Sequence, residues 1–219
     1  MNDYAKFLNS CADDIKEYAN SQKIQFIMMP YASHFGGLVE AGVKSCKHHL
    51  RRVLGDAHLT YEEFSTVLTQ IEAILNSRPL SPMSSDPQDY SSLSPGHFLV
   101  GRPLTAPVLA DLNDVAAHRL SCYQRVEQIH QHFWTRWSRE YGSELQIRTK
   151  WTRNMGDLKP DTLVLNKEDH APPLKWNLGR ITKTFPGSDG VSRVADIRTA
   201  HGIVHRAFSK ICPLPVNEE

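Results

Sequence analysis

The part of this 219-residue sequence whose spacing could do chemistry is a carboxylate followed by three cations. Glu40 is followed by Lys44, Lys47 and Arg51. At about 100° per residue of an α-helix, the three cations fall within roughly 40° of Glu40. A carboxylate near a helix start is stabilised by the helix dipole and suits Mg²⁺ as an oxygen ligand, and the cations behind it could hold DNA phosphates.

The same spacing has an ordinary structural interpretation. Glu40 and Lys44 stand four residues apart in the orientation that favours an ion pair on a solvated helix face. The four residues alone leave both interpretations open.

Composition narrows the function classes only in part. The net charge of +1 does not indicate a nucleic-acid-binding protein, but the segment 41–54 carries four cations and no acid. No apolar run reaches the roughly 18 residues of a membrane span, and no signal peptide is visible. We therefore expect a protein of the nucleus or cytoplasm, neither secreted nor in a membrane.

The cysteines and histidines do not form a recognisable metal motif. Eleven histidines are present, but none has a cysteine or a second pair at zinc-finger spacing. The four cysteines are far apart, so we expect buried free thiols. They are Cys11, Cys46, Cys122 and Cys212.

Periodicity predicts a helical first part and a strand-rich second part. Thr60 and Glu63 form a capping box that opens one helix. The segment 79–112, rich in proline, serine and glycine, is expected to be an extended, ordered connection. The expected helices cover 2–20, 38–54, 60–76 and 114–141, and the expected strands cover 24–29, 162–167, 176–185, 191–199 and 203–206. The last four strands have the size of a small SH3-like barrel.

The sequence around Glu40, PYASHFGGLVEA, resembles the segment that bears the final glutamate in integrases of BEL/Pao retrotransposons. Val39 and Tyr31 depart from that family, which often has an aromatic residue and an arginine there. Further segments that resemble the family are HLRR (49–52), QIEAILNSRPL (70–80), SPGHFLVGRPL (94–104), FWTRW (133–137), LKWNLGR (174–180), RTA (198–200) and CPLP (212–215).

The resemblance implies a retroviral-type integrase, in which two aspartates and one glutamate hold Mg²⁺ or Mn²⁺ for 3′-end processing and strand transfer. Glu40 matches the glutamate, as the catalytic and metal-binding residue. Lys44 and Lys47 match positions that contact the element's DNA ends. In that family the second aspartate lies near an Asp-Asn-Gly motif, which this sequence lacks. Asp3 is suitably spaced from Glu40, but it is expected on a helix with no strand before it to present its side chain. The chain alone should be inactive and hold no stable metal.

The resemblance also implies an α+β fold with three parts. These are an incomplete RNase H-like core over 1–104, a linker with a long helix over 105–150, and an SH3-like domain over 151–216. Such C-terminal domains bind DNA without strong sequence preference, although this one has a net charge near zero. The candidate DNA-contacting residues are Lys44, Lys47, Arg51, Lys175, Arg180, Arg198 and Arg206.

The expected partners are therefore DNA, as element ends and target, and other copies of an integrase multimer. Two other hypotheses remain open. The chain could be a non-enzymatic module, co-opted for binding nucleic acid or protein, or a gene fragment that does not fold stably.

Overall fold

The computed structural model describes residues 37–146, 159–168, 171–187, 190 and 192–215, with isolated positions at 13, 17, 18 and 21. Apart from those four positions, the helix expected over 2–20 and the strand expected over 24–29 lie outside the described residues. The chain divides into two compact units, Met1–Ser45 and Cys46–Glu219.

Helix α3 (Gly37–Leu54) confirms the helix predicted over 38–54. Glu40 lies in its first turn, and its last turn carries Arg51 and Arg52. This arrangement of charges complements the helix dipole at both ends.

Helix α4 (Tyr61–Asn76) begins at the predicted capping box. Thr60 Oγ1 accepts a hydrogen bond from the Glu63 backbone N–H at 3.2 Å, and Glu63 Oε2 accepts one from the Thr60 N–H at 2.9 Å. Val67, Ile71 and Ile74 form its buried face.

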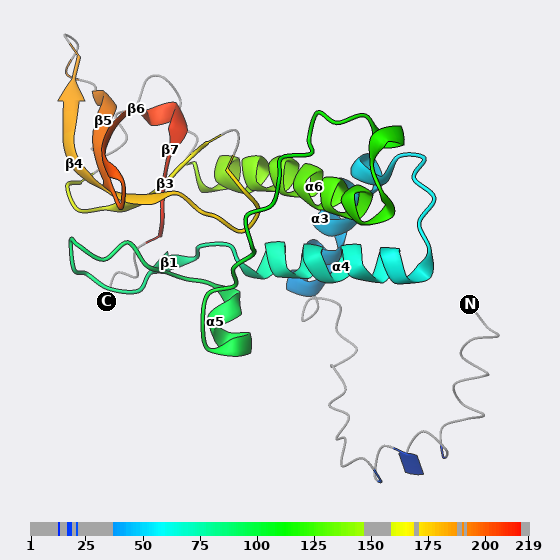
Figure 1. The fold of residues 1–219 in the computed structure, drawn as a ribbon. Helices are drawn as coiled ribbons and strands as arrows, with labels where there is room; N and C mark the ends of the chain where they lie inside the picture. Colours follow the sequence, from blue (N-terminus) through cyan, green and yellow to red (C-terminus); the bar gives the residue numbers. More distant parts are fainter. Residues whose placement is uncertain are drawn as a thin grey trace. The chain divides into compact units, whose positions relative to one another are not determined.

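Helix α6 (Cys122–Leu145) begins eight residues after the predicted start at 114. The prediction was wrong because Ser121 and Gln124 form a second capping box, which starts the helix there. Before it there is only the short 3₁₀ helix η2 (Ala117–Arg119). Helices α4 and α6 pack side by side, as Figure 1 shows, and share one apolar core.

An aromatic cluster of Trp134, Trp137, Tyr141 and Trp176 joins α6 to segments before and after it. Trp176 packs edge-on against the three rings of α6. Its Nε1–H donates to Ser77 Oγ at 3.1 Å, and the Tyr141 hydroxyl donates to the carbonyl of Pro79 at 2.5 Å. The cluster therefore fixes the end of α4 against α6.

The segment 79–112 is largely an extended connection, as predicted. It contains a small antiparallel pair, β1 (Ser81–Pro82) with β2 (Ser92–Leu93). It also contains α5 (Pro95–Val100), a short helix that was not predicted.

The second part of the chain forms a five-stranded antiparallel sheet of order β6-β5-β4-β3-β7. Its buried core comprises Val164, Ile181, Ala195, Ile197 and Ile211. Among the described residues, the edge strands β6 and β7 do not pair with each other, so the sheet is open. The strands are β3 (Leu163–Asn166), β4 (Leu178–Pro186), β5 (Ser192–Thr199), β6 (Gly202–Ala207) and β7 (Ile211–Pro213), with the 3₁₀ helix η3 (Phe208–Lys210) before the last.

Four of these strands match the predicted ones, and β7 was not predicted. The α+β class is confirmed. The domain boundaries at 104 and 150 stay predictions.

Candidate nucleic-acid interface

Helix α3 presents its charged residues to solvent. Glu40 and Lys44 are exposed in the first unit of the chain, and Lys47 and Arg51 are exposed in the second. Half a turn from Lys47, His49 is buried, with its Nε2 3.2 Å from the Glu140 carboxylate. Burial lowers the pKa of His49, although Glu140 opposes that shift. The helix thus has a buried side, and the candidate cations are outside it.

Arg180, a predicted DNA contact, is used inside the protein. It is 4% exposed. Its guanidinium donates from Nε to the carbonyl of Asp89 at 2.9 Å, from Nη1 to that of Asp161 at 2.7 Å and from Nη2 to that of Ser84 at 2.8 Å. This geometry fastens the 84–89 loop to β4, and it leaves no open guanidinium edge for a phosphate.

Arg198 and Lys175 differ in how accessible they are. Arg198 pairs directly across the sheet with Arg180 and is half-buried. Its Nε is buried and has no hydrogen-bond partner among the described residues. Lys175 is exposed and lines a cavity of about 280 Å³, together with Lys167 and Lys210. Of these two candidates, Lys175 is the more accessible cation.

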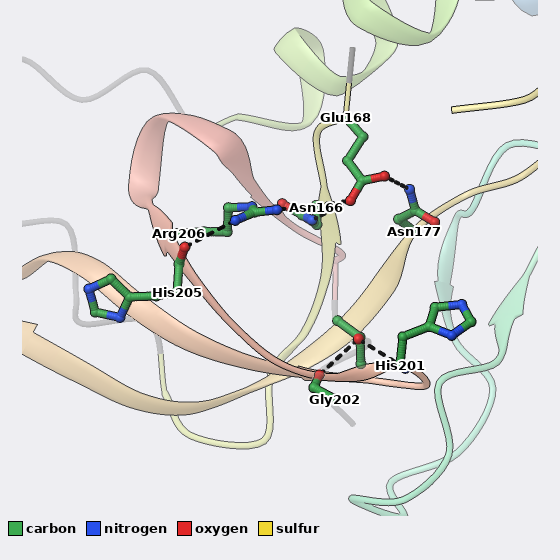
Figure 2. Close-up of polar contacts among 8 residues, drawn as sticks. Asn166, Glu168, Asn177, His201, Gly202, His205 and Arg206 are labelled. Atoms are coloured by element: carbon green, nitrogen blue, oxygen red, sulfur yellow. Dashed lines mark hydrogen bonds and ion pairs between the residues drawn. The ribbon is translucent and has the colours of Figure 1, made fainter. Parts of the chain in front are cut away.

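Arg206 belongs to a polar cluster shown in Figure 2. Its Nη2 lies 4.0 Å from Glu168 Oε1, and its Nη1–H donates to the His205 carbonyl at 3.2 Å. Glu168 also accepts from the side-chain amides of Asn177, at 2.5 Å, and Asn166, at 3.4 Å. Arg206 is half-buried, and its guanidinium already faces the Glu168 carboxylate.

A second group of side chains, which sequence reasoning missed, lies across β4, β5 and β6. The register places Lys183 opposite Asp196, and Asp196 opposite His205. Lys183 Nζ lies 5.0 Å from the centre of the Phe185 ring, and the His205 ring packs edge-on against Phe185. His205 Nδ1 and Asp196 Oδ1 are 2.6 Å apart.

Aromatic rings beside cations are typical of surfaces that bind nucleic-acid strands. The alternation of β4 could have indicated Lys183 and Phe185. Finding His205 required the register of a third strand.

A protein family described as a family of unknown function (DUF5641) matches residues 121–214, from the cap of α6 to just after the end of β7. No curated protein and no solved structure matches the chain.

None of the helices that the structure describes has the length and apolar character of a membrane span. In the same residues no group of three or more histidine, cysteine or acidic side chains is arranged to hold a metal ion.

Proposed function

We propose that this chain is derived from a BEL/Pao-type integrase and binds DNA. In this proposal, residues 1–104 are the downstream part of an RNase H-like core, α6 is the linker helix, and the antiparallel sheet is an SH3-like domain. The observation that carries the proposal is the exposure of Lys44, Lys47 and Arg51 at successive turns of α3.

Helix geometry supports this role. With a rise of about 1.5 Å per residue, the three cations follow one another at intervals of about 4.5 to 6 Å along the helix. Each lysine or arginine that neutralises a phosphate releases condensed counterions, which is the main source of non-specific DNA affinity. Lys183, with the Phe185 ring beside it, offers a second contact surface.

Catalysis by the chain alone is not part of the proposal. Mg²⁺ takes near-octahedral oxygen ligands, and a two-metal site needs several carboxylates, whereas Glu40 supplies one. The aspartates that the resemblance requires are not matched in this sequence, so the residues present do not by themselves fit the metal site. In an intact integrase Glu40 would be the third carboxylate.

Salt-dependent binding to duplex DNA tests the proposal. Each phosphate contact contributes about 0.9 to the slope of log affinity against log salt, so the triple variant Lys44→Ala, Lys47→Ala, Arg51→Ala should lower the slope by nearly three. The control is the double variant Arg102→Ala, Arg119→Ala, which removes two exposed arginines elsewhere. An unchanged slope in the triple variant, or the same loss per removed charge in the control, would overturn the proposal.

Glu40→Gln separates binding from chemistry. We expect this variant to bind DNA as well as the wild type does, and both proteins to show no strand transfer with Mg²⁺ or Mn²⁺. Strand transfer by the wild-type chain that Glu40→Gln abolishes would contradict the expected inactivity.

A protein-binding role is the second candidate, favoured by α5. Phe98, Leu99 and Val100 are consecutive and 74%, 63% and 55% exposed. Adjoining exposed apolar side chains are typical of interaction surfaces. If copies of the chain associate here, sedimentation will show concentration-dependent dimers that the double variant Phe98→Ser, Leu99→Ser loses. A monomer at all concentrations would contradict self-association.

A further inference from the structure

A cluster of cations surrounds the cavity of about 280 Å³ that lies between the second half of α6, the end of β3, the segment 171–177 and η3. The charged residues that line it are Arg139, Lys167, Lys175, Lys210 and Glu168. The described lining therefore carries four positive charges against one negative charge. A hollow lined mainly by one sign of charge concentrates ions of the opposite sign, so this cavity should attract anions.

The single acid of the lining is already engaged by neighbouring groups, as Figure 2 shows. Glu168 Oε2 accepts from the Asn177 side-chain amide at 2.5 Å, and Glu168 Oε1 accepts from that of Asn166 at 3.4 Å. Arg206 Nη2 lies 4.0 Å from Oε1. Because Arg206 is not one of the lining residues, it offsets the charge of Glu168 without engaging any cation of the cavity.

Lys167 is held in place by neutral groups of α6. Its Nζ donates to Gln146 Oε1 at 2.9 Å and to Ser143 Oγ at 3.2 Å. Its stem runs close to Gly142, since a Cβ added to that glycine would lie 2.9 Å from Lys167 Cε. Neither accepting oxygen is charged, and an ammonium group has three N–H donors. Lys167 therefore keeps a full positive charge and one donor for a ligand, in a position that the helix fixes.

Two other lysines reach the cavity from separate elements. Lys175 lies in the segment 171–177, and Lys210 is the last residue of η3. Both side chains are exposed, so a dissolved ligand can meet them without any rearrangement of the fold. Three ammonium groups from three segments of the chain thus line one cavity.

We propose that this cavity binds a small phosphate monoester. At pH 7 a monoester carries a charge of about −1.5 to −2 and three strong acceptor oxygens, and lysine binds phosphate as a point charge. Ala171 and Trp176, both half-buried, offer an apolar wall to the organic group of the ester. The volume lies just below the range of about 300–1,000 Å³ of drug-sized ligands, which suits a smaller molecule. The site is separate from the DNA contacts proposed on α3 and β4 and does not depend on them.

Calorimetric titration of the full chain with phenyl phosphate tests this site, with phenol as the uncharged control. Saturable one-to-one binding of phenyl phosphate without binding of phenol is expected. Methyl phenyl phosphate, a diester with one negative charge like the phosphates of a DNA backbone, should bind about tenfold more weakly because it loses one charge-assisted contact. Equal binding of the diester would assign the cavity to backbone phosphates and overturn the proposal, as would the absence of saturable binding of phenyl phosphate.

Matched lysine variants test the residues. Lys175→Gln removes an exposed cation of the lining and should weaken phenyl phosphate binding about tenfold, the usual loss when a hydrogen bond to a charged group is removed. The control is Lys183→Gln, which removes an exposed lysine of β4 that does not line the cavity and should leave binding unchanged. Unchanged affinity in Lys175→Gln, or an equal loss in Lys183→Gln, would overturn the proposal.

Gly142→Ala tests the placement of Lys167 without removing a charge. The three atoms nearest to the added Cβ all belong to the Lys167 side chain, so the helix should form as before while the ammonium group is displaced. Affinity for phenyl phosphate should fall, by less than in Lys175→Gln because the charge stays nearby. Circular dichroism and urea denaturation check that the fold is kept, and unchanged affinity in a folded Gly142→Ala would contradict the role of Lys167.

Discussion

Replacing Arg180 with lysine should destabilise the second unit of the chain by about 3–5 kcal/mol, the usual cost of breaking a buried charged network. The guanidinium makes three hydrogen bonds of 2.7–2.9 Å to backbone carbonyls. Hydrogen bonds to charged groups contribute about 1.5–3 kcal/mol each, and a lysine ammonium in this place can reach one carbonyl but not the other two. One of the three accepting carbonyls is that of Asp161, whose backbone φ of 65° lies in the strained left-handed region.

Urea denaturation of the wild type and of Arg180→Lys measures this loss as a difference in the free energy of unfolding. Duplex DNA binding of Arg180→Gln, which removes the positive charge that lysine would keep, is compared with that of the wild type under conditions where both are folded. We expect no change in the salt slope of DNA binding. If the free energy of unfolding changes by less than about 0.5 kcal/mol, as at an ordinary surface site, and the slope falls by one contact, the guanidinium faces DNA and our reasoning is refuted.

Three other predictions concern packing and titration. A Cβ at Gly179 would lie 2.5 Å from Ile197 Cγ2, so Gly179→Ala should cost about 1–3 kcal/mol in urea denaturation, and equal stability would contradict the packing. Burial raises the pKa of Cys212 to about 11, so iodoacetamide at pH 8 should label the exposed Cys122 but reach Cys212 only after unfolding, as mass spectrometry would show; equal labelling rates would contradict this. Burial also raises the pKa of Tyr141 from 10.0 to about 12. The stabilisation of the fold by its neutral phenol is therefore complete below pH 10 and is lost as the pH rises through 12. The stability difference from Tyr141→Phe should then move in favour of the variant over that range, and a difference independent of pH would argue against a buried phenol.

Local signals in the sequence predicted the elements whose causes are local. The capping box at Thr60 fixes the start of α4 because its two hydrogen bonds join residues only three apart. The same logic applied to Ser121 would have placed the start of α6 correctly. Val67 and Ile71, four residues apart on α4, both lie in the core, whereas Tyr123 in the first turn of α6 is 66% exposed.

Properties that depend on distant partners could not be predicted in this way. Arg180 looked like a DNA contact because nothing near it in sequence reveals that carbonyls 91 and 96 residues earlier meet its guanidinium. The pairing of His205 with Asp196 depends on the register between β5 and β6. The exposure of Lys44 and Lys47 followed from helical spacing, since burial on one side of α3 leaves the other side open.

The aromatic cluster is part of an apolar core that determines which elements must be kept together when this region is moved into another protein. The family match begins at Ser121, yet Trp134 and Trp137 share their core with Val67 and other residues of α4. A gene segment that began at the matched boundary would encode one half of an apolar interface. Recombination or engineering that keeps this interface must therefore move α4 together with α6 and the sheet.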